Sequence, residues 1–150
     1  SALLLGKAKD NNASSAIGPF IRLFDGGFGM DDVRRAELEL VVEGTDGFVL
    51  NGHSSMKEIS RDPLDLVAQT VGRHHQYPDG FMLYLGTLFA PVEDRDVAGE
   101  GFTHKVGDIV SISTPALGTL TNTVRLATEC PPWNFGAAAL MKNLAGRGLL

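Results

Sequence analysis

The stretch GFTHKVGDIVSISTPALGTLTNTV, from Gly101 to Val124, contains two turns and two strands of the predicted fold. A Gly-Asp turn precedes an apolar run, which predicts a buried strand over Ile109–Ser113. The Thr-Pro-x-Leu-Gly pattern that follows predicts another turn, and the next strand is expected over Leu120–Ala127. We therefore expect a fold that is rich in strands.

The clearest strand signal upstream lies in Ala36–Glu43, where apolar residues alternate with the period of a half-buried strand. A Thr-Asp-Gly turn follows, and Phe48–Leu50 is expected to return as the hairpin partner. Two short apolar runs, Phe20–Phe24 and Phe81–Leu85, are also predicted to be strands.

Two helices are predicted to cover the sheet. The first begins at Asp62-Pro63, because an N-cap aspartate accepts from free backbone amides and proline suits the first helical position. It is expected to reach His75, and its apolar stripe, which includes Val67, should be buried against the sheet. The second helix is expected near Phe135–Leu144.

Length and composition favour a single domain over residues 1–150. A net charge of −5 without clustered lysine and arginine argues against a nucleic-acid partner. No apolar run approaches the roughly 20 residues of a membrane span, so no membrane is expected. Cys130 is the single cysteine of the sequence and suits a reducing compartment, which predicts a cytoplasmic location.

Several motifs resemble the C-terminal part of the fumarylacetoacetate hydrolase family. They are the Leu-Gly-Thr step at Leu85–Thr87, the stretch Gly101–Val124, and an Ala-Lys step followed by a polar turn and Ile-Gly-Pro within Leu5–Pro19. The tail from Cys130, with Pro-Pro-Trp-Asn-Phe-Gly, and the Phe-Thr-His-Lys around His104 are similar to a subgroup of 2-keto-3-deoxy sugar-acid dehydratases. The resemblance covers nearly the whole chain.

The resemblance implies a mainly β, α+β fold, a mixed rolled β-sandwich with a few short helices. It also implies a metal-dependent enzyme that acts on a 2-oxo acid, assembles as a homo-oligomer (dimer or tetramer), and dehydrates a 2-keto-3-deoxy sugar acid. Mg²⁺, or Mn²⁺ or Ca²⁺ in its place, would polarise the substrate carbonyl. Two alternatives stay open: hydrolysis of a C–C bond in fumarylacetoacetate- or acylpyruvate-type β-diketo acids, and a non-catalytic scaffold.

Three site residues follow from the resemblance. Lys9 matches the active-site lysine of the family and would stabilise the charge that develops on the substrate oxygen, with Lys7 as the neighbouring candidate. Gly86 and Thr87 match the substrate-binding Gly-Thr pair. A glycine there lets the ligand approach the backbone, and the threonine hydroxyl donates to the substrate carboxylate.

The pair Glu37 and Glu39 has the spacing of metal ligands on one strand face. In the family order, however, the metal ligands precede the segment that resembles residues 3–19. We therefore interpret this pair as the solvated face of an edge hairpin and expect the ligands upstream of Ser1, in a longer polypeptide. Ser54, Ser55 and Met56 are expected to shape the turn before the first helix, and the roles of Glu100 and His104 stay open.

Overall fold

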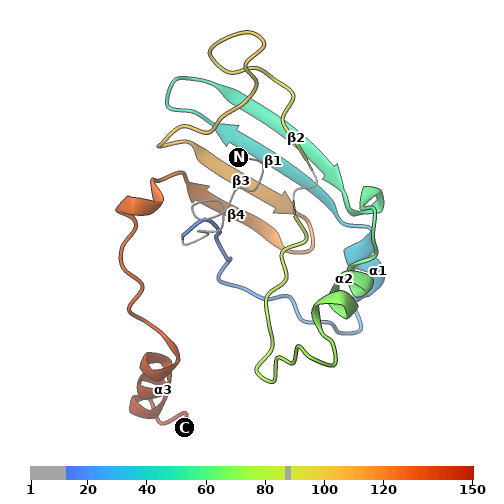
Figure 1. Cartoon of the computed structure of the whole chain (residues 1–150), viewed down its shortest axis with the longest axis vertical. Helices are drawn as coiled ribbons and strands as arrows, with labels where there is room; N and C mark the ends of the chain where they lie inside the picture. Colours follow the sequence, from blue (N-terminus) through green and yellow to red (C-terminus); the bar gives the residue numbers. More distant parts are fainter. Residues whose placement is uncertain (1–12, 87–88) are drawn as a thin grey trace. The chain divides into compact units, whose positions relative to one another are not determined.

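The computed structural model describes residues 13–86 and 89–150. The chain divides into two units: residues 16–124 form one, and residues 125–150 belong with the N-terminal residues up to Ser15 in the other. The larger unit is built on a four-stranded antiparallel sheet with a few short helices (Figure 1). This arrangement confirms the prediction of an α+β chain that consists mainly of sheet.

The sheet has the strand order β2-β1-β3-β4, and each neighbouring pair is antiparallel. Its strands are β1 (Glu37–Glu43), β2 (Val49–Ser55), β3 (Ile109–Thr114) and β4 (Gly118–Thr123). The predicted hairpin is confirmed, although β2 is longer than expected. The prediction that this hairpin lies at an edge is wrong for its first strand, because β3 pairs with the other side of β1.

The alternation in β1 is confirmed by how the strands pair. Val42 is opposite Leu50 on β2 and Val110 on β3, and since paired residues share a face, these side chains lie together. Val42 and Leu50 are 0% and 1% exposed. The other buried apolar side chains among the described residues are Phe28 and Met56.

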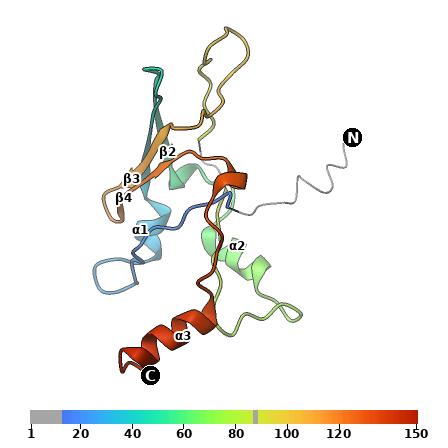
Figure 2. The same ribbon diagram turned by 90° about the vertical axis from the view of Figure 1, so that its left-hand side faces the viewer.

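Three short helical segments gather at the end of the sheet where β1 begins and β2 ends, as both views show (Figures 1 and 2). They are α1 (Met30–Arg34), the 3₁₀ helix η2 (Met56–Glu58) and α2 (Pro63–Thr70). The sequence prediction missed α1, whose start is held by Asp32 accepting from the Gly29 amide at 2.8 Å.

The helix predicted at Pro63 is confirmed at its start, where Asp62 Oδ1 accepts from the Leu64 amide at 2.9 Å. Its predicted end is wrong, because Val71 is extended and Gly72 exchanges backbone hydrogen bonds with His75 in a tight turn. The predicted buried stripe is also wrong: Leu64 is 49% and Val67 is 37% exposed.

Two predicted strands, Phe20–Phe24 and Phe81–Leu85, do not form in the described residues. A strand needs a neighbouring backbone to satisfy its amides and carbonyls, and apolar composition alone does not supply one. Neither segment joins the sheet, and Phe20 is 89% exposed. The strand predicted over Leu120–Ala127 is displaced, since β4 begins at Gly118 and ends at Thr123.

The smaller unit contains the 3₁₀ helix η3 (Ala127–Glu129) and the helix α3 (Ala137–Gly146). The predicted helix over Phe135–Leu144 is thus confirmed with both ends shifted by two residues. Within the described ranges, every helix is too short or too polar to cross a membrane.

Candidate functional site

Of the three predicted site residues, Gly86 is described, whereas Lys9 and Thr87 lie outside the described residues. Gly86 has a φ of +87°, and no atom of the described residues lies within 4 Å of the position where its Cβ would stand. Its backbone conformation, rather than crowding, therefore requires glycine. Gly86 lines a pocket of about 260 Å³, which we call the Gly86 pocket.

The floor of the Gly86 pocket is the apolar face of the sheet. Leu38 and Leu40 come from β1, Ser54 from β2 and Ile112 from β3. The strand pairing brings them together, because Leu38 is opposite Ser54 and Leu40 is opposite Ile112. The residues that complete the lining are Gly86, Phe89, Glu39 and His53.

One wall of the pocket depends on a glycine in β2. A Cβ added at Gly52 would lie 2.6 Å from Cε1 of Phe89, closer than real contacts allow. The missing side chain therefore lets the Phe89 ring rest on the sheet beside the pocket. Sequence reasoning missed both residues, since a glycine inside a strand signals close approach without naming the partner.

Glu39 and His53 border the Gly86 pocket, but their side chains and that of Glu37 alternate along the strands with those of Leu38 and Ser54 and so lie on the opposite face of the sheet. Glu37 accepts hydrogen bonds from Lys57 Nζ and Ser55 Oγ, both at 2.9 Å, and lies 3.3 Å from His53 Nε2. The pKa of Glu37 is lowered, first by the bond from Lys57 and then by that from Ser55. Glu37 is half-buried and Glu39 is exposed, so this pair faces solvent on an inner strand of the sheet.

The described residues do not fit a Mg²⁺ site. No three histidine, cysteine, aspartate or glutamate side chains within residues 13–86 and 89–150 converge on a point where an ion could bind. Glu37, the strongest single candidate, already accepts from a lysine and a serine.

The residues Ser54, Ser55 and Met56 do not act together as expected. Ser55 Oγ accepts from the Lys57 amide at 3.3 Å and caps η2, so its predicted turn-shaping role is confirmed. Met56 is 6% exposed and belongs to the core. Ser54 instead lines the Gly86 pocket, and its hydroxyl is considered below.

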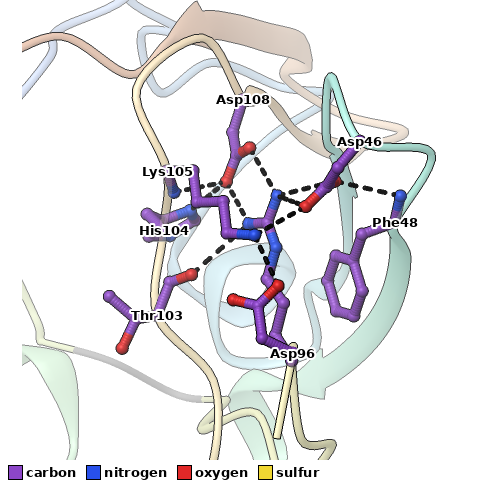
Figure 3. Close-up of polar contacts among 8 residues, drawn as sticks. Asp46, Phe48, Asp96, Thr103, His104, Lys105 and Asp108 are labelled. Carbon is purple, nitrogen blue, oxygen red and sulfur yellow. Dashed lines mark hydrogen bonds and ion pairs between the residues drawn. The ribbon is translucent and has the colours of Figure 1, made fainter.

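A second polar centre, the Arg95 cluster, consists of Arg95 with Asp46, Asp96, Lys105 and Asp108 (Figure 3). Arg95 forms a two-point pair with Asp108 at 2.6 and 2.9 Å and reaches Asp46 at 3.0 Å. Lys105 Nζ lies 2.8 Å from Asp46 and 2.6 Å from Asp96. The Arg95 and Asp108 side chains are 2% and 0% exposed.

The Arg95 cluster joins three parts of the larger unit: the β1–β2 turn through Asp46, the loop before β3, and the residue before β3. The guanidinium of Arg95 also lies over the Phe48 ring, 4.7 Å from its centroid. The hydrogen bond from Arg95 lowers the pKa of Asp108 to about 2. Because its charges pair with one another, we interpret the cluster as a structural clamp.

His104 lies at the margin of this cluster. Its Nδ1 is 3.6 Å from Asp108 Oδ2. Its ring packs edge-on against that of Phe102, with 4.8 Å between the ring centroids. Local sequence patterns could not have found the cluster, since Asp46 and Arg95 are 49 residues apart. Asp46, Lys105 and Asp108 were visible in the sequence only as parts of local motifs: the Thr-Asp-Gly turn, the Phe-Thr-His-Lys stretch and the Gly-Asp turn before β3.

Comparison with known proteins adds no relative: no family model, no curated protein and no solved structure matches the chain.

Proposed function

We propose that this chain is the C-terminal part of a catalytic domain of the fumarylacetoacetate hydrolase type and acts on a 2-oxo acid. The reaction we propose is dehydration of a 2-keto-3-deoxy sugar acid, in a homo-oligomer whose completed fold is a mixed rolled β-sandwich. The observation that carries the proposal is the position of Gly86. The glycine of the Leu-Gly-Thr step lines a pocket against the sheet, where the resemblance expects substrate.

The volume of the Gly86 pocket and the open backbone at Gly86 both suit a small ligand. Its volume of about 260 Å³ is just below the range of roughly 300–1,000 Å³ that is usual for ligand sites. At Gly86 a ligand can approach the main chain without meeting a side chain. Leu38, Leu40 and Ile112 would shield the reacting atoms from water.

The described residues do not fit Mg²⁺, so the proposal places the metal ligands outside them, in the position that the resemblance implies. When bound, the metal would supply polarisation of the substrate carbonyl. Within this chain, Lys9 would stabilise negative charge on the substrate oxygen and Thr87 would bind its carboxylate, both from outside the described residues.

One observation favours the second candidate, hydrolysis of a C–C bond in an acylpyruvate-type substrate. Leu38, Leu40, Phe89 and Ile112 give the Gly86 pocket an apolar lining. An acyl group suits that lining better than the hydroxyl groups of a sugar acid do. Both candidate reactions should therefore be measured in the same assay.

The test compares Gly86→Ala with Gly80→Ala in the complete protein. Gly86 and Gly80 have φ values of +87° and +86°, and neither has an atom of the described part of the chain within 4 Å of its missing Cβ, so the backbone strain is matched. Of the two, Gly86 lines the pocket. Turnover of a 2-keto-3-deoxy pentonate and of an acylpyruvate would be measured with Mg²⁺ present.

We expect Gly86→Ala to lower kcat/KM at least tenfold more than Gly80→Ala does. Equal losses in the two variants would remove Gly86 from the site. Cleavage of acylpyruvates without any dehydration would select the hydrolase, and no turnover of either substrate would contradict the proposed function.

A further inference from the structure

We propose that Ser54 is the hydrogen-bonding residue of the Gly86 pocket, and that it binds an oxygen atom of a ligand whose remaining surface is apolar. The inference rests on the proposed function insofar as it places a ligand in that pocket. The inference adds Ser54 to the site as a residue that determines specificity. It also names the chemical group of the ligand that Ser54 contacts.

The first argument is an unpaired hydroxyl. Ser54 Oγ is buried, yet it has no hydrogen-bond partner among the described residues. A buried polar group without a partner destabilises a fold, so each one calls for an explanation. Two other hydroxyl groups on the sheet are paired although they are less buried: Ser55 Oγ donates to Glu37, and the exposed Ser111 Oγ lies 2.9 Å from Thr121 Oγ1.

The second argument is the position of Ser54. It is opposite Leu38 in the strand pairing, and strand alternation puts it on the same face as Gly52, the glycine under Phe89. It lines the Gly86 pocket together with Leu38, Leu40 and Ile112. Its neighbours His53 and Ser55 contact Glu37 on the opposite face.

These neighbours define the ligand chemistry. Leu38, Leu40, Phe89 and Ile112 offer carbon surface. The Ser54 hydroxyl, which is shielded from water in this structure, can donate or accept once its side chain rotates toward the pocket. A neutral carbonyl group on a short carbon chain matches both the apolar surface and the single hydroxyl. We infer that the pocket binds the ketone end of a 2-oxo or β-diketo acid at Ser54.

The experiment uses 2-pentanone as a probe, with cyclopentane as its purely apolar counterpart. Binding to the full chain would be followed through the methyl NMR signals of Leu38, Leu40 and Ile112. Ser54→Ala should weaken 2-pentanone about threefold to tenfold and leave cyclopentane unchanged. Ser111→Ala, on the opposite face, should change neither.

Thermal unfolding separates ligand binding from a structural role. Because Ser54 has no described partner, Ser54→Ala should keep or raise the melting temperature, whereas Ser111→Ala should lower it. A lower melting temperature in Ser54→Ala would overturn the inference. Equal 2-pentanone affinity in wild type and Ser54→Ala, or no binding to wild type, would do the same.

The inference and the proposed function can fail separately. If neither acid substrate is turned over and Ser54→Ala still weakens 2-pentanone selectively, the function is wrong and the role of Ser54 stands. If turnover is found and the probe does not distinguish Ser54→Ala from wild type, the role of Ser54 is wrong and the function stands.

Discussion

Gly52 on β2 shows how a single missing side chain shapes the candidate site. The Phe89 ring occupies the space that a Cβ at residue 52 would need. A glycine inside a strand normally weakens the strand. At residue 52 this local loss of stability accompanies the close contact of the Phe89 ring with the sheet.

We expect Gly52→Ala to destabilise the chain by about 1–3 kcal/mol, because the new methyl group must displace an aromatic ring. Gly26→Ala is the control, since nothing lies within 4 Å of its missing Cβ and its φ is not in the left-handed region. Urea denaturation measures both. A loss in Gly26→Ala as large as that in Gly52→Ala would contradict the crowding argument.

Lys9 and Thr87 lead to a kinetic prediction at the same scale. If the proposed function holds, Lys9→Met should lower kcat more than it raises KM, because its charge would act as negative charge develops on the substrate. Thr87→Val should mainly raise KM. Glu37→Gln, on the sheet face opposite the floor of the Gly86 pocket, should change neither. Steady-state kinetics of the complete protein are the measurement, and full activity in Lys9→Met would remove that residue from the site.

At the scale of elements, the sheet and α2 differ in how much apolar surface they bury. Leu50 on β2 is 1% exposed and Leu64 on α2 is 49% exposed. The spacing of apolar residues predicts a stripe on both elements, but only contacts decide whether the stripe is covered.

The two leucines give a matched test. Leu50→Ala should lower the free energy of unfolding by about 2–5 kcal/mol, since it leaves a cavity in the core. Leu64→Ala should cost less than about 1 kcal/mol in this chain, because its side chain already contacts water. Chemical denaturation checks both values, and equal losses would mean that α2 is covered in solution.

The Arg95 cluster also acts between elements. Asp108→Asn should lower the urea midpoint several times more than Asp31→Asn, because it leaves the buried Arg95 without its closest partner. Asp31 pairs with Arg34 on the surface, where such pairs contribute little. Similar midpoints in the two variants would show that the cluster is not a clamp.

For the whole molecule, paired carboxylates predict a loss of stability in acid. The pKa of Asp108 falls from 3.8 to about 2 through Arg95, and that of Asp25 to about 2 through Arg22. The pKa of Asp46 is lowered as well, first by Lys105. A carboxyl group with a lower pKa in the folded state stabilises the fold above its unfolded pKa and loses that contribution on protonation.

The melting temperature should therefore be insensitive to these groups above about pH 4 and should fall between pH 3.8 and about 2. Thermal scans across this range test the prediction. Asp108→Asn should lower the melting temperature above pH 4 and flatten the fall below it. A variant with the same slope as wild type would show that Asp108 does not contribute to the fall.

The amino-acid sequence by itself determined those elements whose signals are local. The alternation of β1 reports which face is buried, and it needs no knowledge of the partner strand. The start of α2 follows from Asp62 and Pro63, because a cap acts within two residues. The turn before β3 is local in the same way. Gly86 was a candidate from a three-residue step, and the resemblance rather than the pattern gave it a role.

The tertiary structure alone decided what depends on distant partners. β1 became an inner strand because β3, more than 60 residues later, pairs with its free side. Phe20–Phe24 has the composition of a strand but no described backbone to pair with. The burial of the Ser54 hydroxyl and the pairing of charges around Arg95 depend on contacts between separate elements. Such contacts have no sequence period, so a single sequence carries no local signal for them.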